Sequence, residues 1–202
     1  PSLGLKHYLK TKGIQATVIV PNDFPKFLKW MPEAKKIVIA DYKRKVAGEA
    51  IYNADVIFCL DFNSPMRIGI LGDWVTKAKA KKILIDHHQM PEKFDYVYSD
   101  TTIPATCQMV YHFIQENHDE KSVNMDIAQC LYTGIMTDTG GFRFRSTSAS
   151  THRIVADLIE KGADPAVITS NTWDTNTISR LHLLSLVLSR IELTKDGKVA
   201  IP

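Results

Sequence analysis

The chain has 202 residues, of which 45% are hydrophobic and 23% are charged, as is typical of a soluble globular protein with one well-buried core. A formal net charge of +3 favours anionic ligands weakly and excludes the basic stripe of a dedicated duplex-DNA-binding protein. Three widely spaced cysteines argue against a disulfide scaffold and favour a reducing cytoplasm. No window approaches the roughly 18 apolar residues of a membrane span, so we expect no membrane partner.

The first half of the chain alternates between short apolar runs and helical patterns. Unbroken runs rich in valine and isoleucine are typical of strands buried on both faces of a parallel sheet. The predicted strands are Ala16–Val20, Lys36–Ala40, Ala54–Leu60 and Lys82–Ile85, and the predicted helices are Leu3–Lys12, Lys43–Asn53 and Gly72–Ala80. This alternation predicts an α/β fold with a doubly wound, mostly parallel sheet.

The second half of the chain is predicted to be helical. Helical patterns cover Pro104–Asn117, Met125–Met136, Ser148–Lys161 and Ile178–Ile191, and Asp164-Pro165 opens another turn. The tail after residue 191 contains a turn signal at 195–198. We therefore expect one domain over 1–191, incomplete at its amino end because the chain starts with Pro and runs straight into a helix. Residues 192–202 are expected to be a linker and the start of a truncated further domain.

Aspartate follows three of the predicted strands, as Asp41, Asp61 and Asp86. Ligands of an open parallel sheet bind beyond the carboxyl ends of its strands, where such carboxylates would point. A single aspartate at this position is more often a helix cap or a turn former, which is our interpretation of Asp41. Asp86 differs because His87 and His88 follow it directly. One or two of these three side chains can bind a metal, while the others orient the ligand.

A polar, glycine-rich turn follows the long apolar helix that begins at Met125. Asp138 stands at the helix end, where its carboxylate can be aimed at a metal. Gly140 and Gly141 allow the backbone to approach a ligand closely, and Arg143 can grip a phosphate with its planar guanidinium group.

Asp61, His87 and Asp138 together offer oxygen, nitrogen and oxygen ligands. This set suits Mn²⁺, Fe²⁺ or Zn²⁺, and an oxygen-rich shell in a phosphoryl-transfer site favours Mn²⁺ or Mg²⁺. Three ligands are too few for two ions.

Four sequence segments resemble successive motifs of the DHH phosphoesterase family in order and spacing. They are CLDFNSPMRIG around Asp61, the triplet Asp86-His87-His88, the helix from Pro104 with Ala105-Thr106-Cys107, and TDTGGFRF around Asp138. The resemblance covers nearly the whole chain. The last segment, with FPKFLKWMP near the start, points to the branch of nanoRNases and 3′-phosphoadenosine-5′-phosphate phosphatases.

The resemblance implies two Mn²⁺ ions, with Mg²⁺ as the alternative. It makes Asp61 the carboxylate that bridges both ions, and makes His87 and Asp138 ligands of the second ion. The family's motif H-x-x-P-D-x-D-A-x-G-S, which supplies the remaining ligands, has no counterpart in these 202 residues, and neither does its C-terminal Gly-Gly-Gly-His motif.

The resemblance gives the other candidates supporting roles. Asp86 and His88 are expected to be catalytic groups beside the metal or facing the substrate. Arg143, with Gly140 and Gly141, is expected to bind the substrate phosphate.

The function implied is that of a cytoplasmic hydrolase that cleaves phosphate esters of short oligonucleotides, or of an adenosine bisphosphate, by a two-metal, bridging-hydroxide mechanism. Its partners would be short single-stranded RNA or DNA or a small nucleotide. The oligomeric state stays open, a homodimer included. The 202 residues alone are expected to be inactive and to bind metal poorly, with Pro1 beside the metal crevice, unless Asp41 or His152 supplies further ligands.

Several alternatives use the same residues. A cyclic-dinucleotide phosphodiesterase or a single-strand exonuclease would share the chemistry, and a manganese pyrophosphatase fits less well. A non-catalytic, nucleotide-binding regulatory domain belongs to another class and fits the absent motif. A flavodoxin-like signalling domain leaves the His87-His88 pair and the TDTGGFR segment unexplained.

Overall fold

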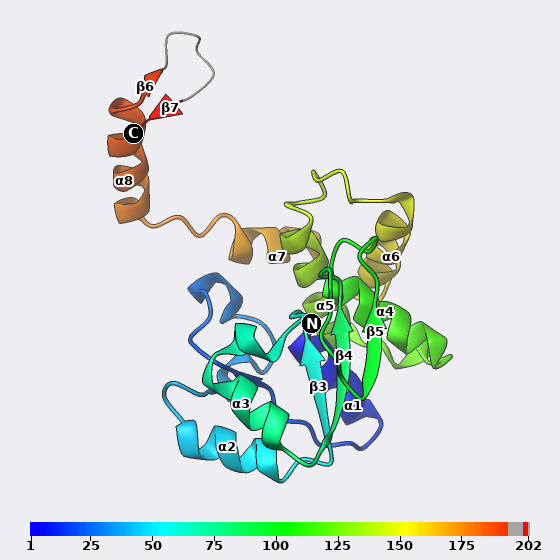
Figure 1. Ribbon diagram of the computed structural model, residues 1–202. Helices are drawn as coiled ribbons and strands as arrows, with labels where there is room; N and C mark the ends of the chain where they lie inside the picture. The colour runs from blue at the N-terminus through cyan, green and yellow to red at the C-terminus, as the bar shows by residue number, and fades with distance from the viewer. Residues whose placement is uncertain (194–199, 202) are drawn as a thin grey trace.

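A parallel sheet forms the centre of the fold in the computed structural model, which describes residues 1–193 and 200–201. Strand β4 (Lys81–Asp86) lies between β3 (Val56–Leu60) and β5 (Tyr96–Ser99), and both neighbours run parallel to it. A second parallel pair consists of β1 (Ile19–Val20) and β2 (Val38–Ile39). Figure 1 shows the three-stranded sheet with its carboxyl ends directed toward the helices of the second half.

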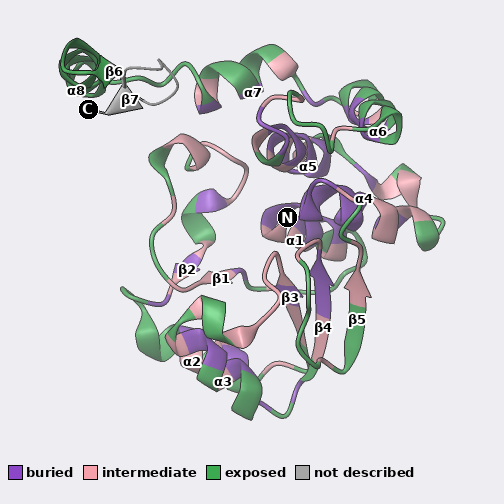
Figure 2. Cartoon of the chain, turned by 45° about the horizontal axis from the view of Figure 1, so that its top comes forward, coloured by how far each residue is buried: buried purple, intermediate pink, exposed green. Residues whose placement is uncertain are grey.

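Helices cover both faces of this sheet, which confirms the predicted doubly wound α/β fold. The first face carries α2 (Arg44–Tyr52) and α3 (Ile70–Lys77), and the second carries α1 (Ser2–Thr11), α4 (Thr106–Glu116), α5 (Met125–Asp138) and α6 (Ala149–Glu160). Leu84 belongs to the core on the first face and Ile85 to the core on the second, and both are 0% exposed. Successive strand residues point to opposite faces, so burial on both sides explains the unbroken apolar run. Figure 2 shows β4 as the most buried strand.

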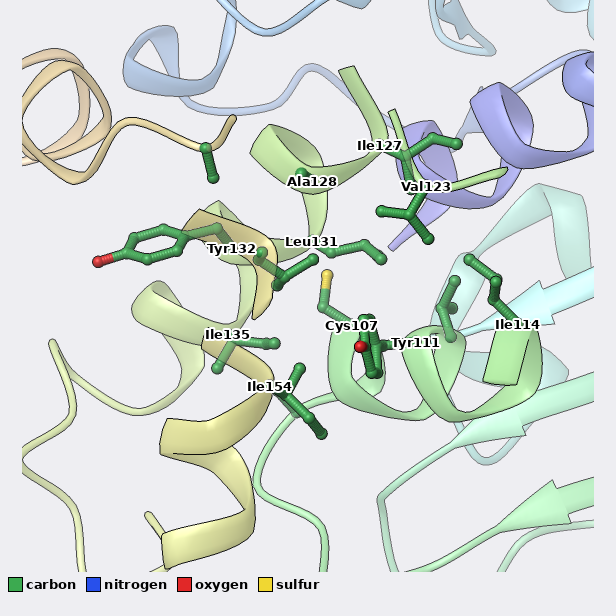
Figure 3. Close-up of a cluster of buried hydrophobic side chains, with 14 of the residues drawn as sticks. Cys107, Tyr111, Ile114, Val123, Ile127, Ala128, Leu131, Tyr132, Ile135 and Ile154 are labelled. Carbon is green, nitrogen blue, oxygen red and sulfur yellow. The ribbon is translucent and has the colours of Figure 1, made fainter. Parts of the chain in front are cut away.

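Helix α5 is the centre of the larger core and carries Asp138 at its end. Ile127, Leu131 and Ile135 on this helix are fully buried against α4 and α6, as Figure 3 shows. A Cβ atom at Gly134 would lie 2.0 Å from Cys107 Sγ, so only glycine allows α4 and α5 to approach this closely. This packing fixes the position of the helix end relative to the sheet.

The structure departs from the sequence predictions in the strands. β5 was not predicted, because it is short and its Tyr96 and Val97 are exposed at the sheet edge. The predicted strands at 16–20 and 36–40 are each reduced to two residues. β3 is an edge strand, and Val56 at its start is 44% exposed. Further along, Phe58 and Leu60 pack against the core on one face, and Ile57 and Cys59 pack into the core on the other, as predicted. An apolar hollow of about 640 Å³ lies beside β3, lined partly by the chain around β1.

The last elements pack little against the rest of the chain. Helix α7 (Pro165–Thr172) buries Ile168 in the core, whereas α8 (Ile178–Ser189) has no buried residue and projects away in Figure 1. Beyond it, β6 (Glu192–Leu193) pairs antiparallel with β7 (Ala200–Ile201), and the predicted turn at 195–198 lies outside the described residues. None of the helices in the described part of the chain has the length and hydropathy needed to span a membrane.

Candidate metal centre and the turn beside it

Asp61 is the first residue after β3 and is held in place from two sides. Its N–H donates to the Ile85 carbonyl at 3.2 Å, which extends the ladder between β3 and β4 by one residue. Its φ of 69° lies in the left-handed region, which is uncommon for a residue with a side chain. Backbone strain of this kind is frequent at functional sites. The buried Thr106 hydroxyl, at the start of α4, donates to Asp61 Oδ1 at 2.7 Å.

His87 follows β4 and is oriented by a backbone carbonyl. Its Nδ1 lies 3.1 Å from the Ile103 oxygen, and because a carbonyl only accepts, Nδ1 carries the proton. The other nitrogen, Nε2, is then available as an acceptor and lies 3.6 Å from Asp61 Oδ1. A histidine that donates from one nitrogen and presents the other is the usual form of a metal ligand.

His88 is oriented in the same manner by a buried carboxylate. Asp86 is 0% exposed, and its Oδ1 accepts from His88 Nδ1 at 2.7 Å. The second oxygen of Asp86, Oδ2, is buried and has no hydrogen-bond partner in the described chain. A carboxylate buried with one unpaired oxygen is costly unless positive charge lies nearby.

Asp61, His87 and His88 form one group, with candidate ligand atoms that all lie within 4.8 Å of one another. The sequence predicted Asp61 and His87 as metal ligands and gave His88 a supporting role. The geometry also offers His88 as a third candidate metal ligand. Asp138 lies outside this group, although its carboxyl is near enough for the charges of the group to act on it. Burial of that carboxyl and the negative charge of Asp61 raise the pKa of Asp138 to about 6, and the nearby His87 and His88 oppose the shift.

These side chains fit a divalent cation. The carboxylates of Asp61 and Asp138 and the imidazoles of fixed orientation offer lone pairs and negative charge to a cation. The buried Asp86, bonded to His88, adds further negative charge. Asp138 as a whole residue is exposed to solvent, although protein atoms surround its carboxyl group.

Pro1 lies close to Asp61, as the sequence led us to expect. Figure 1 places the amino terminus at the carboxyl end of β3. The nitrogen of Pro1 lies close to the Cys107 thiol and the Asp61 carboxylate.

Neither of the two alternative ligands joins the metal group. Asp41 lines a separate hollow of about 390 Å³ together with Arg67. The His152 ring lies beside Phe142, with ring centroids 5.7 Å apart.

The turn after α5 has an unusual backbone. Gly140, Gly141 and Phe142 have consecutive φ values of 60°, 73° and 66°. A Cβ at Gly140 would lie 2.6 Å from the Phe144 ring, and one at Gly141 would lie 3.0 Å from the Trp173 ring. Both positions thus require glycine because of the backbone conformation and because an aromatic ring packs against each. The close approach of these glycines to a substrate stays a prediction.

Arg143 follows this turn and is exposed. Its Nε donates to the Gly140 carbonyl at 2.6 Å, and its guanidinium carbon lies 5.4 Å from the centre of the Trp173 ring. This hydrogen bond leaves the two Nη groups as its remaining donors, in a pair that matches a phosphate.

Sequence reasoning missed three contributors to this region. Thr106 appeared in a motif, but its bond to Asp61 spans 45 positions. The Ile103 carbonyl and the Trp173 ring carried no local signal, because each acts through a contact distant in the chain.

Comparison with known proteins agrees with the motifs. The model of the DHH family, N-terminal domain, matches residues 2–135. The bifunctional oligoribonuclease and PAP phosphatase NrnA of Thermus thermophilus is 31% identical over 97% of this chain and 56% of its own length. The NrnA of Bacillus subtilis is 24% identical over 78% of this chain and 49% of its own. The chain thus spans about half the length of these curated relatives.

A solved structure gives the same result. The crystal structure of an exopolyphosphatase-related protein from Bacteroides fragilis is 40% identical, with a TM-score of 0.94 over 96% of this chain and 58% of that chain. The match to the family model covers well over half of the described residues. The chain therefore belongs to the DHH family, and its resemblance to the nanoRNase and PAP phosphatase branch is confirmed.

Proposed function

We propose that this protein is a metal-dependent hydrolase that cleaves phosphate esters of short oligonucleotides or of an adenosine bisphosphate. The observation that carries the proposal is the convergence of Asp61, His87 and His88 at the carboxyl ends of β3 and β4. The names of the Thermus and Bacillus relatives, oligoribonuclease and PAP phosphatase, support this substrate class.

In this proposal Asp61, His87 and Asp138 hold divalent cations, and His88 is a further donor. Two bound Mn²⁺ ions, with Mg²⁺ as the alternative, would supply a Lewis acid and activated water at neutral pH. Thr106 keeps the Asp61 carboxylate in position through its hydroxyl. Ligands beyond these are expected from the motif that has no counterpart in the 202 residues.

The remaining residues act on the imidazoles and on the substrate. Asp86 keeps the proton of His88 on Nδ1 and balances the charge that gathers on that ring. Arg143 binds a substrate phosphate through its Nη groups, and the turn at Gly140 and Gly141 connects it to the end of α5, where Asp138 stands. We further propose that the catalytic domain ends at residue 191 and that residues 192–202 begin a linker. A cytoplasmic location is also proposed, and the three free, buried cysteines support it.

A hydrolysis assay on the protein at its full natural length tests the proposal. Phosphorylated RNA dinucleotides, an adenosine 3′,5′-bisphosphate, cyclic dinucleotides and pyrophosphate are each incubated with Mn²⁺, with Mg²⁺ and with a chelator. We expect Mn²⁺-dependent cleavage of the first two substrates. Binding of nucleotide without cleavage would overturn the proposal in favour of a regulatory domain, and preference for a cyclic dinucleotide or pyrophosphate would reassign the substrate.

A further inference from the structure

Trp173 is 39% exposed and stands at the end of a helix that is anchored in the core. It caps the end of α7, where its backbone N–H donates to the Thr169 carbonyl at 2.8 Å. The helix is anchored by Ile168, which is 0% exposed in the main core. The Thr169 hydroxyl also lies 3.8 Å from the sulfur of Met136, on α5. Helix α7, which ends at Trp173, is therefore in contact with the helix that carries Asp138.

The exposed guanidinium of Arg143 is fixed by two contacts that leave its outer donors free. The Gly140 carbonyl accepts from Nε, and the Trp173 ring lies 5.4 Å from the guanidinium carbon. The glycine at 141 gives the indole room, since a Cβ there would lie 3.0 Å from the ring. An exposed arginine otherwise samples many rotamers, and ordering it on binding a phosphate costs affinity.

We propose that Trp173 is a positioning residue for substrate binding, which stacks on Arg143 and presents its Nη donors to a substrate phosphate. The inference rests on the proposed function and adds to it a residue outside the four motifs. The phosphate recognised is one carried by a short nucleotide, which is the substrate class of the proposed function. Trp173 touches no reacting atom, so its loss should weaken binding and leave the chemical step intact.

The test compares Trp173→Leu with Trp173→Phe by steady-state hydrolysis of a phosphorylated RNA dinucleotide at the full natural chain length. We expect Trp173→Leu to raise KM about 3- to 10-fold with kcat nearly unchanged, because the π face that attracts the guanidinium is lost. Phe keeps a π face and should restore most of the affinity. Trp173→Met replaces the leucine variant if the latter does not fold.

Two further variants separate this role from general packing. Arg44 lies over the Trp74 ring at 5.8 Å, on α2 and α3, so Trp74→Leu removes a matched pair elsewhere and should leave KM unchanged. In an Arg143→Ala background, Trp173→Leu should raise KM no further, because the two residues act as one unit. An unchanged KM in Trp173→Leu, or the same rise on top of Arg143→Ala, overturns the inference. Absence of hydrolysis by the wild-type protein instead overturns the proposed function on which it rests.

Discussion

The candidate site is built from two regions that are held in place by different forces. At the strand ends, each candidate ligand is oriented by one hydrogen bond. Asp61 accepts from Thr106, His87 donates to the Ile103 carbonyl, and His88 donates to Asp86. In the turn after α5, the exposed Arg143 is oriented by one hydrogen bond to the nearby Gly140 carbonyl and by packing on the Trp173 ring. Hydrogen bonds to buried groups set angles strictly, whereas stacking on an exposed ring is weaker and tolerates movement.

This contrast implies a division of labour. The strand ends should control metal binding and turnover, because small displacements there change the position of ligands. The turn should control substrate affinity, because it contributes one cation to a bound phosphate. The following predictions separate the two regions in the proposed hydrolase.

The largest effect is expected from Asp61→Asn. Loss of the carboxylate removes metal-based stabilisation worth several kcal/mol, so kcat should fall on the order of 10³-fold while the circular dichroism spectrum stays native. Asp41→Asn is the matched control, because Asp41 also follows a strand but lies outside the metal group. Mn²⁺-dependent turnover at the wild-type rate in Asp61→Asn would contradict the assignment.

A smaller loss is expected from Thr106→Val, which keeps the shape of the side chain and removes the hydroxyl bonded to Asp61. Metal affinity or kcat should fall about 10- to 100-fold, as for other residues that orient a ligand. Mn²⁺ titration calorimetry and kinetics measure the change. Thr133→Val removes another buried hydroxyl, bonded to the Gln129 carbonyl, and should cost stability without affecting the metal. Equal behaviour of the two variants would show that Thr106 is only structural.

Arg143→Lys tests the turn. Lysine keeps the charge but loses the paired donors and the planar stack, so kcat/KM should fall about 10-fold, mostly through KM. Arg145→Lys, two positions on in the same exposed stretch, serves as the control. A fall in kcat alone would place Arg143 with the strand-end region and remove the proposed division.

The smallest effect is expected from Gly141→Ala, compared with Gly13→Ala. Both glycines have φ near 70°, but a Cβ at Gly13 meets nothing within 4 Å, whereas at Gly141 it meets Trp173. Each variant should lose about 1–2 kcal/mol of unfolding free energy from the left-handed backbone. Only Gly141→Ala should also raise KM, because the displaced indole no longer supports Arg143. Denaturant titration and kinetics on both variants decide between strain alone and strain with displacement.

The sequence by itself determined the fold class and most of the chemistry of the strand ends. Unbroken apolar runs and helical spacing record burial directly, so the α/β alternation, the long helix α5 and the Asp-His-His triplet could be identified from local patterns. Because parallel strands meet at one edge, Asp61 and His87 could also be placed together without coordinates.

Tertiary structure alone decided which other residues join them. The position of His88 as a third candidate metal ligand depends on the hydrogen bond between its Nδ1 and Asp86. The hydrogen bond from Thr106 to Asp61 depends on how α4 packs on the sheet. Trp173 reaches Arg143 only because α7 is anchored in the core 30 positions later in the chain. Local patterns record which side of an element is buried, but contacts between distant segments depend on register and packing, which no short stretch of sequence encodes.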